Sequence, residues 1–154
     1  MLYLVQHGEA LSKEQDPDRP LSPRGESDIT RIAGFLAAAG ISVDRVIHSG
    51  KTRARQTATI LAGTLSATGA VETQDGISPN DSVEMFADVL TAWSTPTMVV
   101  GHLPFMAKLV TYLLTQNSEP SIVTYQPGSV VYMSQDEQNR WTLNWMVRPE
   151  LLLD

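Results

Sequence analysis

Two histidines in this chain directly follow short apolar segments. Residues 2–5 precede Gln6-His7-Gly8, and residues 97–100 precede Gly101-His102. In open α/β sheets ligands bind at the carboxyl ends of strands, and a glycine there lets the backbone approach a ligand closely. Taken alone, the first stretch favours a helix-capping or core histidine. A catalytic histidine needs support from elsewhere in the chain.

That support comes from a third apolar segment, which ends in His48-Ser49-Gly50. Lys51, Arg53 and Arg55 follow it at the start of a predicted helix. If the three segments are parallel strands, their ends lie on one edge of a sheet and gather His7, Arg53 and His102. Helix N-termini favour anions. The three motifs together therefore predict an anion site the size of a phosphate group.

The elements that position these residues follow from hydrophobic periodicity. Short apolar or alternating runs predict strands, and helical periodicity predicts the segments between them. The expected strands cover 2–6, 43–48, a weak one near Val71, 97–100, 129–134 and 141–147, with a loop over 12–20.

Helix boundaries are indicated by capping residues. Ser22-Pro23 is typical of an N-cap followed by proline at the first helical position, and Gly40 is placed to end that helix. A second helix is expected over about 52–65. Asp81 to Glu84 has the form of a capping box with Asp81 as N-cap, and a fourth helix should follow Pro104.

Strands that alternate with helices predict an α/β fold with a mostly parallel central sheet. We expect one three-layer α/β/α domain over residues 1–154. A chain of this length can bury a core without disulfides, and it contains no cysteine.

The net charge of −6 argues against broad binding to nucleic acids or anionic membranes, although it allows a small basic pocket. The N-terminus has no signal-peptide pattern, and no apolar run approaches a membrane span. These features predict a cytoplasmic protein. They leave its oligomeric state open.

The motifs also resemble a known family. QHGEA after the first strand, RPLSPRG, HSGKTRARQTA and VVGHLP are similar to the motifs of the histidine phosphatase superfamily, also called phosphoglycerate-mutase-like. The short chain, with Arg-Pro-Leu and no large insertion, looks most like SixA-type phosphohistidine phosphatases.

The resemblance implies roles for individual residues. His7 matches the nucleophilic histidine, and His102 matches the second catalytic histidine. Arg53 is implied as the catalytic arginine that holds phosphate. Gly8 and Arg19 match further phosphate contacts.

Gln6 occupies a phosphate-binding position where the family usually has arginine. This departure opens the possibility of a weakly active, phospho-binding regulatory protein.

The leaving group separates the remaining alternatives. An alkyl alcohol leaves poorly without a positioned acid, and the nearby candidates are Asp75, Asp81 and Glu84, none within a clear acid motif. A phosphohistidine on a signalling protein is therefore the expected substrate, and a small phosphomonoester is the alternative. No cofactor or metal is expected. A metal site built on His7, His48 and His102 would lack an HExxH-like or acidic cluster.

Overall fold

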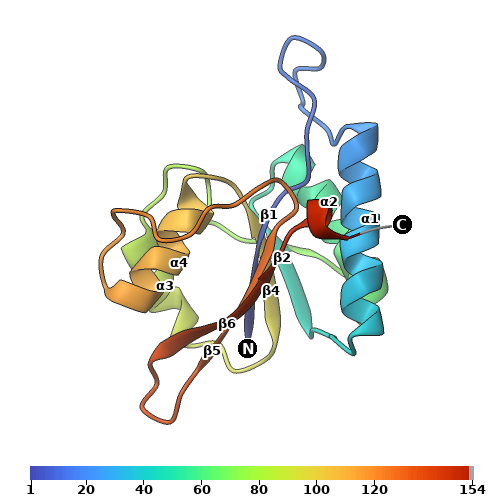
Figure 1. Ribbon diagram of the computed structural model, residues 1–154. Helices are drawn as coiled ribbons and strands as arrows, with labels where there is room; N and C mark the ends of the chain where they lie inside the picture. Colours follow the sequence, from blue (N-terminus) through green and yellow to red (C-terminus); the bar gives the residue numbers. More distant parts are fainter. Residues whose placement is uncertain (153–154) are drawn as a thin grey trace.

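The computed structural model describes residues 1–152 and contains a six-stranded sheet. Its strands are β1 (Leu2–Gln6), β2 (Arg45–His48), β3 (Glu72–Thr73), β4 (Thr97–Gly101), β5 (Val130–Gln135) and β6 (Trp141–Val147). They lie in the order β3-β2-β4-β1-β5-β6 (Figure 1). The pairings among β1, β2, β3 and β4 are parallel, whereas β5 and β6 add antiparallel pairings at one edge.

Helices cover both faces of this sheet (Figure 1). The helices are α1 (Pro23–Ala38), α2 (Thr52–Leu65), α3 (Val83–Leu90) and α4 (Phe105–Thr115), followed by a short 3-10 helix, η1 (Pro149–Leu151). α1 and α2 pack together on one face, and α3 and α4 pack together on the other. The α/β class and the mostly parallel sheet predicted from the sequence are confirmed.

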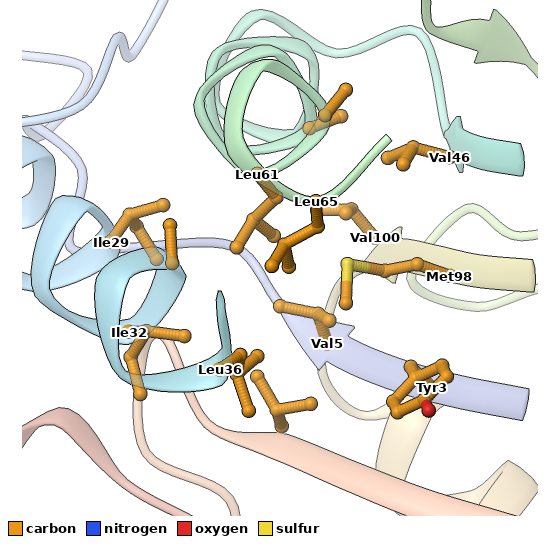
Figure 2. Close-up of a cluster of buried hydrophobic side chains, with 14 of the residues drawn as sticks. Tyr3, Val5, Ile29, Ile32, Leu36, Val46, Leu61, Leu65, Met98 and Val100 are labelled. Atoms are coloured by element: carbon orange, nitrogen blue, oxygen red, sulfur yellow. The ribbon is translucent and has the colours of Figure 1, made fainter. Parts of the chain in front are cut away.

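The core between the sheet and the α1–α2 layer is built from alternate strand residues. Tyr3 and Val5 of β1 face α1 and α2, as Figure 2 shows. Leu2 and Leu4 face the opposite core, which α3 and α4 cover. Side chains alternate between the two faces of the sheet along a strand. The register of β1 therefore also sets which face each residue after β1 approaches.

The N-terminus of α1 has the predicted cap. Ser22 is the N-cap, its hydroxyl accepts a hydrogen bond from the Gly25 N–H at 3.0 Å, and Pro23 opens the helix. The same hydroxyl donates to the Glu9 carboxylate at 2.7 Å. Glu9 therefore ties the segment after β1 to the start of α1.

Several predicted boundaries were wrong by one or two residues; β5, for example, covers Val130–Gln135 rather than 129–134. β2 begins at Arg45 because Val43 makes only an isolated bridge to Ser66. The weak strand expected near Val71 is confirmed as β3, which covers Glu72–Thr73.

The N-cap of α3 is Ser82 rather than Asp81. The Asp81 carboxylate instead accepts a hydrogen bond from the Ser78 N–H at 2.8 Å, within the preceding turn. Both residue types cap helices well, so composition alone does not separate two adjacent candidates.

Candidate active site

Neighbouring parallel strands bring the sequence motifs to one edge of the sheet. β1 and β2 both pair with β4, and Gln6 lies beside Gly101 in this register. The His7 N–H donates to the Gly101 carbonyl at 3.0 Å. The rings of His7 and His102 have centroids 5.0 Å apart and planes inclined at 55°. The two histidines, 95 positions apart in the sequence, therefore share one site.

The hydrogen bonds of His7 define its tautomer. Nδ1 lies 2.7 Å from the Gly8 carbonyl oxygen, which can only accept, so Nδ1 carries the proton. Nε2 accepts a hydrogen bond of 3.3 Å from the Arg53 Nε–H. The lone pair of Nε2 is thus directed toward the guanidinium group, where a bound anion would lie. This is the tautomer that nucleophilic attack through Nε2 requires.

The surroundings of His7 keep its imidazole neutral. Burial lowers its pKa to about 4, and the nearby positive charges of Arg53 and Arg19 act in the same direction, against the bond to Gly8. At neutral pH the ring therefore carries an available lone pair.

Gly8 is required by close packing. A Cβ at this position would lie 2.8 Å from a side-chain carbon of Ile29 and 3.2 Å from one of Leu21. The Gly8 N–H donates to the Thr57 hydroxyl at 3.1 Å, and that hydroxyl donates to the Arg53 carbonyl at 2.8 Å. The glycine thus fixes the backbone after β1 against the first turns of α2.

His102 is almost fully buried, with 1% of its surface exposed. Its Nε2 lies 2.6 Å from the Ser49 hydroxyl, and its Nδ1 has no hydrogen-bond partner among residues 1–152. Burial is the main cause that lowers its pKa to about 3, and the charges of His7, Arg53, Lys51 and Arg19 add to the effect. A bound phosphate would oppose these causes because a neighbouring anion favours the protonated ring.

Ser49 is a site residue that the sequence reasoning missed. It lies directly after β2, and its only sequence sign is its position between His48 and Gly50 at a strand end. Its hydroxyl is a direct partner of His102 and also accepts a weak bond from the Lys51 N–H at 3.4 Å. We therefore assign Ser49 a positioning role on His102.

Replacement of Ser49 by alanine should lower kcat by roughly fivefold, since one hydrogen bond contributes about 1 kcal/mol. The variant should also shift the pH dependence of kcat, which a purely structural role would leave unchanged. Ser49→Thr keeps a hydroxyl and should recover most of the activity. Steady-state rates from pH 5 to 9 would test this, and an unchanged profile in Ser49→Ala would remove the assignment.

Arg19 reaches the site from the loop over residues 12–20, which projects from the edge where the parallel strands end (Figure 1). Its backbone is in the left-handed region, with φ of 48°, and its Nε donates to the Leu11 carbonyl at 3.0 Å. Arg19 lines an open cavity of about 450 Å³ together with Lys13, Lys51 and Arg53. It makes no hydrogen bond to His7 or His102, and its positive charge lowers the pKa of both.

A larger cavity of about 700 Å³ lies between α1 and the chain around η1. The described residues that line it include Arg24 and Asp28 and none of the strand-end histidines. Neither histidine lines the smaller cavity, but Arg53 does, and its Nε–H donates to the His7 Nε2. The chemistry therefore points to the smaller cavity.

Gln6 and His48 stand apart from the His7–His102 pair. Gln6 belongs to the register of Leu2 and Leu4, so its side chain starts toward the α3–α4 face. It is 7% exposed, and its Oε1 has no hydrogen-bond partner among residues 1–152. The His48 Nδ1 accepts a bond from the Gly50 N–H at 3.0 Å, which gives it a local role in the turn.

Carboxylates are kept away from the histidines. Within residues 1–152, no Asp or Glu makes a hydrogen bond or ion pair with His7, Arg53 or His102. Glu84, one sequence candidate for a general acid, accepts from the Ser82 hydroxyl at 3.2 Å. In the same range, no group of three or more His, Cys, Asp or Glu side chains could hold a metal ion.

The two histidines predict a loss of stability in acid. Their pKa values in the folded chain, about 4 and about 3, lie below the ordinary value of 6.5. Between these values the unfolded chain binds protons that the folded chain excludes. The stabilisation is therefore complete above pH 6.5 and decreases as the pH falls toward 4, by up to about 1.4 kcal/mol per pH unit for each histidine.

Urea unfolding at pH 7, 6 and 5 would measure this slope. His7→Asn should show a shallower dependence, and added phosphate should reduce the slope by favouring the protonated rings. Equal free energies of unfolding at pH 7 and 5 would contradict the burial of neutral histidines.

The fold and the histidine–arginine site together are those of an α/β phosphoryl-transfer hydrolase. A sequence profile of the histidine phosphatase superfamily (branch 1) matches residues 2–78, half of the chain, and this range includes His7 and Arg53. The chain belongs to the histidine phosphatase superfamily, as predicted from its motifs.

Similarity extends over nearly the whole chain. Phosphohistidine phosphatase SixA of Escherichia coli (strain K12) is 26% identical over 153 residues, which cover 96% of this chain and 93% of that protein. The structure of the protein histidine phosphatase SixA complexed with tungstate superposes with a TM-score of 0.85, at 24% identity and 97% coverage of both chains.

Phosphatases with other names share the fold. A phosphoserine phosphatase from Entamoeba histolytica, in complex with 3-phosphoglyceric acid, has a TM-score of 0.70 at 16% identity, covering 94% of this chain and 95% of that one. The shared fold does not select a substrate.

Among residues 1–152, no helix is long and apolar enough to cross a membrane.

Proposed function

We propose that the protein is a phosphohistidine phosphatase that acts on a phosphorylated histidine of a partner protein, through a phosphoryl group held on His7. The observation that carries this proposal is the His7 tautomer. Nδ1–H is bound to the Gly8 carbonyl, and Nε2 faces the Arg53 guanidinium. The full-length similarity to SixA of Escherichia coli supports the same substrate class.

In the first step, the Nε2 lone pair of His7 forms a P–N bond as the P–N bond to the substrate imidazole breaks. The substrate imidazole leaves with the electron pair, and it is neutral when its other nitrogen carries a proton. Arg53 has a permanent charge and a planar set of donors suited to the phosphoryl oxygens. It stabilises the charge on those oxygens, which is the main requirement of phosphoryl transfer.

In the second step, water forms a P–O bond and the P–N bond to His7 breaks, with the electron pair returning to Nε2. Since Nδ1 keeps its proton toward the Gly8 carbonyl, the phosphorylated ring is cationic and leaves as neutral imidazole. The protons of the water go to the phosphate product and to solvent. The hydrogen bond to Gly8 thus helps the site form the intermediate and release it.

The absence of a carboxylate beside His7 and His102 among residues 1–152 favours an imidazole leaving group. The pKa of an imidazole is near 6.5, so imidazole departs far more readily than an alkoxide, which needs a positioned acid. A phosphoserine or sugar phosphate would therefore react slowly here.

The test is turnover on matched substrates. A peptide phosphorylated on histidine with phosphoramidate should be hydrolysed much faster than the same peptide carrying phosphoserine, and faster than a panel of sugar phosphates. Equal or faster release of phosphate from a sugar phosphate would favour the alternative, a small-molecule phosphomonoesterase. A phosphoserine phosphatase with the same fold is the reason to include this comparison.

The third candidate, a weakly active phospho-binding protein, depends on Gln6. Glutamine offers a neutral donor where the family usually has a charged one, and charge-assisted hydrogen bonds are about twice as strong. However, Arg19 already adds positive charge at both histidines, and Lys51 adds positive charge at His102. We infer that the site is rebuilt, with these cations supplying the charge that the missing arginine would bring.

Gln6→Arg should therefore leave kcat/KM for the phosphohistidine peptide unchanged or lower it. The new charge would start from a position only 7% exposed and would add to a cluster of cations. A gain of about tenfold or more would show that glutamine simply weakens the site, since a lost oxyanion donor typically costs about 2.7–4 kcal/mol. Phosphate binding without turnover in both proteins would favour the regulatory alternative.

A further inference from the structure

The cations of this chain fall into two groups. Six of its 11 Lys and Arg residues form ion pairs within residues 1–152: Arg24, Arg31, Arg45, Lys108, Arg140 and Arg148. The other five make no ion pair with a carboxylate of that range: Lys13, Arg19, Lys51, Arg53 and Arg55. In a chain of net charge −6, so many cations without a carboxylate partner require an explanation.

All five of these cations belong to the edge of the sheet that holds the two histidines. Lys13, Arg19, Lys51 and Arg53 line the 450 Å³ cavity, and Arg55 lies in the first turn of α2. We call Lys13, Arg19, Lys51 and Arg55 the basic rim. Asp18 is the one carboxylate among the residues that line the same cavity, so four cations face one anion there. This part of the protein therefore has an excess of positive charge in a chain of net charge −6.

A single phosphoryl group does not account for this charge. It carries about −1.5 to −2 at neutral pH, and Arg53 already lies within hydrogen-bond reach of His7. A water molecule takes up about 30 Å³ in the liquid, so the five heavy atoms of a phosphate group cannot fill a cavity of about 450 Å³. Space and charge remain for the groups that surround the phosphate.

The spread of the basic rim favours a macromolecular surface over a small polyanion. Arg55 is two positions from Arg53 on α2, so the two side chains point apart. Lys13 comes from the loop before α1, which projects from the sheet edge (Figure 1). Leu103, directly after His102, is 37% exposed and adds apolar area beside the site.

We propose that the basic rim is a docking surface for a partner protein whose phosphohistidine is surrounded by acidic side chains. This inference rests on the proposed phosphohistidine phosphatase activity and specifies its partner. Opposite charges would raise the rate of encounter and orient the partner, and salt would screen the effect.

The experiment compares two histidine peptides phosphorylated with phosphoramidate, one flanked by Asp and Glu and one by Ser and Gln. We expect kcat/KM to be about tenfold higher for the acidic peptide at low salt, and the ratio to approach one in about 0.5 M salt. Phosphoramidate itself serves as the substrate without flanking groups.

The variant with Lys13→Glu and Arg55→Glu should remove the preference for the acidic peptide and leave turnover of phosphoramidate unchanged. Arg24→Glu is the matched control for each substitution, because Arg24 is exposed on α1 and lines the other cavity. It should keep the preference.

The outcomes separate the two proposals. Equal rates for both peptides at low salt would overturn the docking surface while leaving the phosphatase assignment intact. The docking surface would also be overturned if the double variant lost turnover on a sugar bisphosphate rather than on the acidic peptide. No hydrolysis of either peptide or of phosphoramidate would overturn the phosphatase assignment itself.

Discussion

Replacement of His7 by alanine is expected to abolish covalent phosphorylation and to lower turnover of a phosphohistidine peptide by roughly 10⁴-fold or more, the scale found when a nucleophile is removed. Among the hydrogen bonds of residues 1–152, His7 is the only histidine whose Nε2 accepts from Arg53. Water alone would have to attack the substrate in the variant, in a site arranged for an imidazole. Arg53 would still hold phosphate, so binding should survive the loss of turnover.

The direct measurement is the mass of the protein after rapid mixing with phosphoramidate. Wild type should gain one acid-labile phosphoryl group on His7, and His7→Ala should gain none. His48→Asn is the matched control, since it removes another imidazole at the same sheet edge, whose Nδ1 accepts a hydrogen bond from the Gly50 N–H. Activity of His7→Ala within a few-fold of wild type, or a phosphoryl group found on His102 instead, would reject His7 as the nucleophile.

The fold of His7→Ala should persist. The ring is only partly buried, and its hydrogen bonds lie within the site rather than between helices. Removal of this neutral histidine also removes part of the acid sensitivity described above. An unchanged melting temperature at pH 7 would therefore confirm that the lost activity is chemical rather than structural.

Much of this architecture could be predicted from local patterns. The cap at Ser22 and the proline after it locate α1, and apolar periodicity locates α2 at Thr52–Leu65. Because these helices separate the strands, β1, β2 and β4 are expected to pair in parallel. Parallel pairing in turn places His7 close to His102. Strand-end residues are predictable because register alone places them.

Side-chain partners were harder to predict because they depend on three-dimensional packing. Ser49 contacts His102 across 53 positions, and a serine after a strand looks like an ordinary turn residue. The position of Gln6 on the α3–α4 face depends on the register of β1 against its neighbours. Asp81 and Ser82 are equally good caps by composition, and only the chain geometry selects Ser82.

The protonation state of His102 also depends on its surroundings. The sequence motif identifies His102 only as a second catalytic histidine, and it does not reveal that burial and nearby cations lower the pKa of its ring to about 3. A phosphoryl dianion would raise that pKa by opposing the charges of Arg53, Lys51 and Arg19. We therefore expect substrate binding to be coupled to proton uptake by His102, which would then act as a cationic donor.

Replacement of His102 by alanine should accordingly lower kcat by roughly 10²–10⁴-fold, the range for loss of a general acid or a charge-stabilising donor. Wild-type kcat should decrease at alkaline pH, where the ring in the substrate complex loses its proton. His102→Ala should lack this alkaline decrease. The acid limb of kcat/KM should remain in both proteins, because it reports the pKa of about 4 for His7.

His102→Gln separates the charge of the ring from its hydrogen bond. Glutamine can donate to a phosphoryl oxygen but cannot gain a proton, so it should recover part of the rate and still show no alkaline decrease. The phosphoryl group should accumulate on His7 in both variants if His102 acts mainly in attack by water, and its mass measures this directly. Wild-type kcat in His102→Ala would show that Arg53, Lys51 and Arg19 stabilise the transferring group without a second imidazole, and the contact between Ser49 and His102 would then be structural.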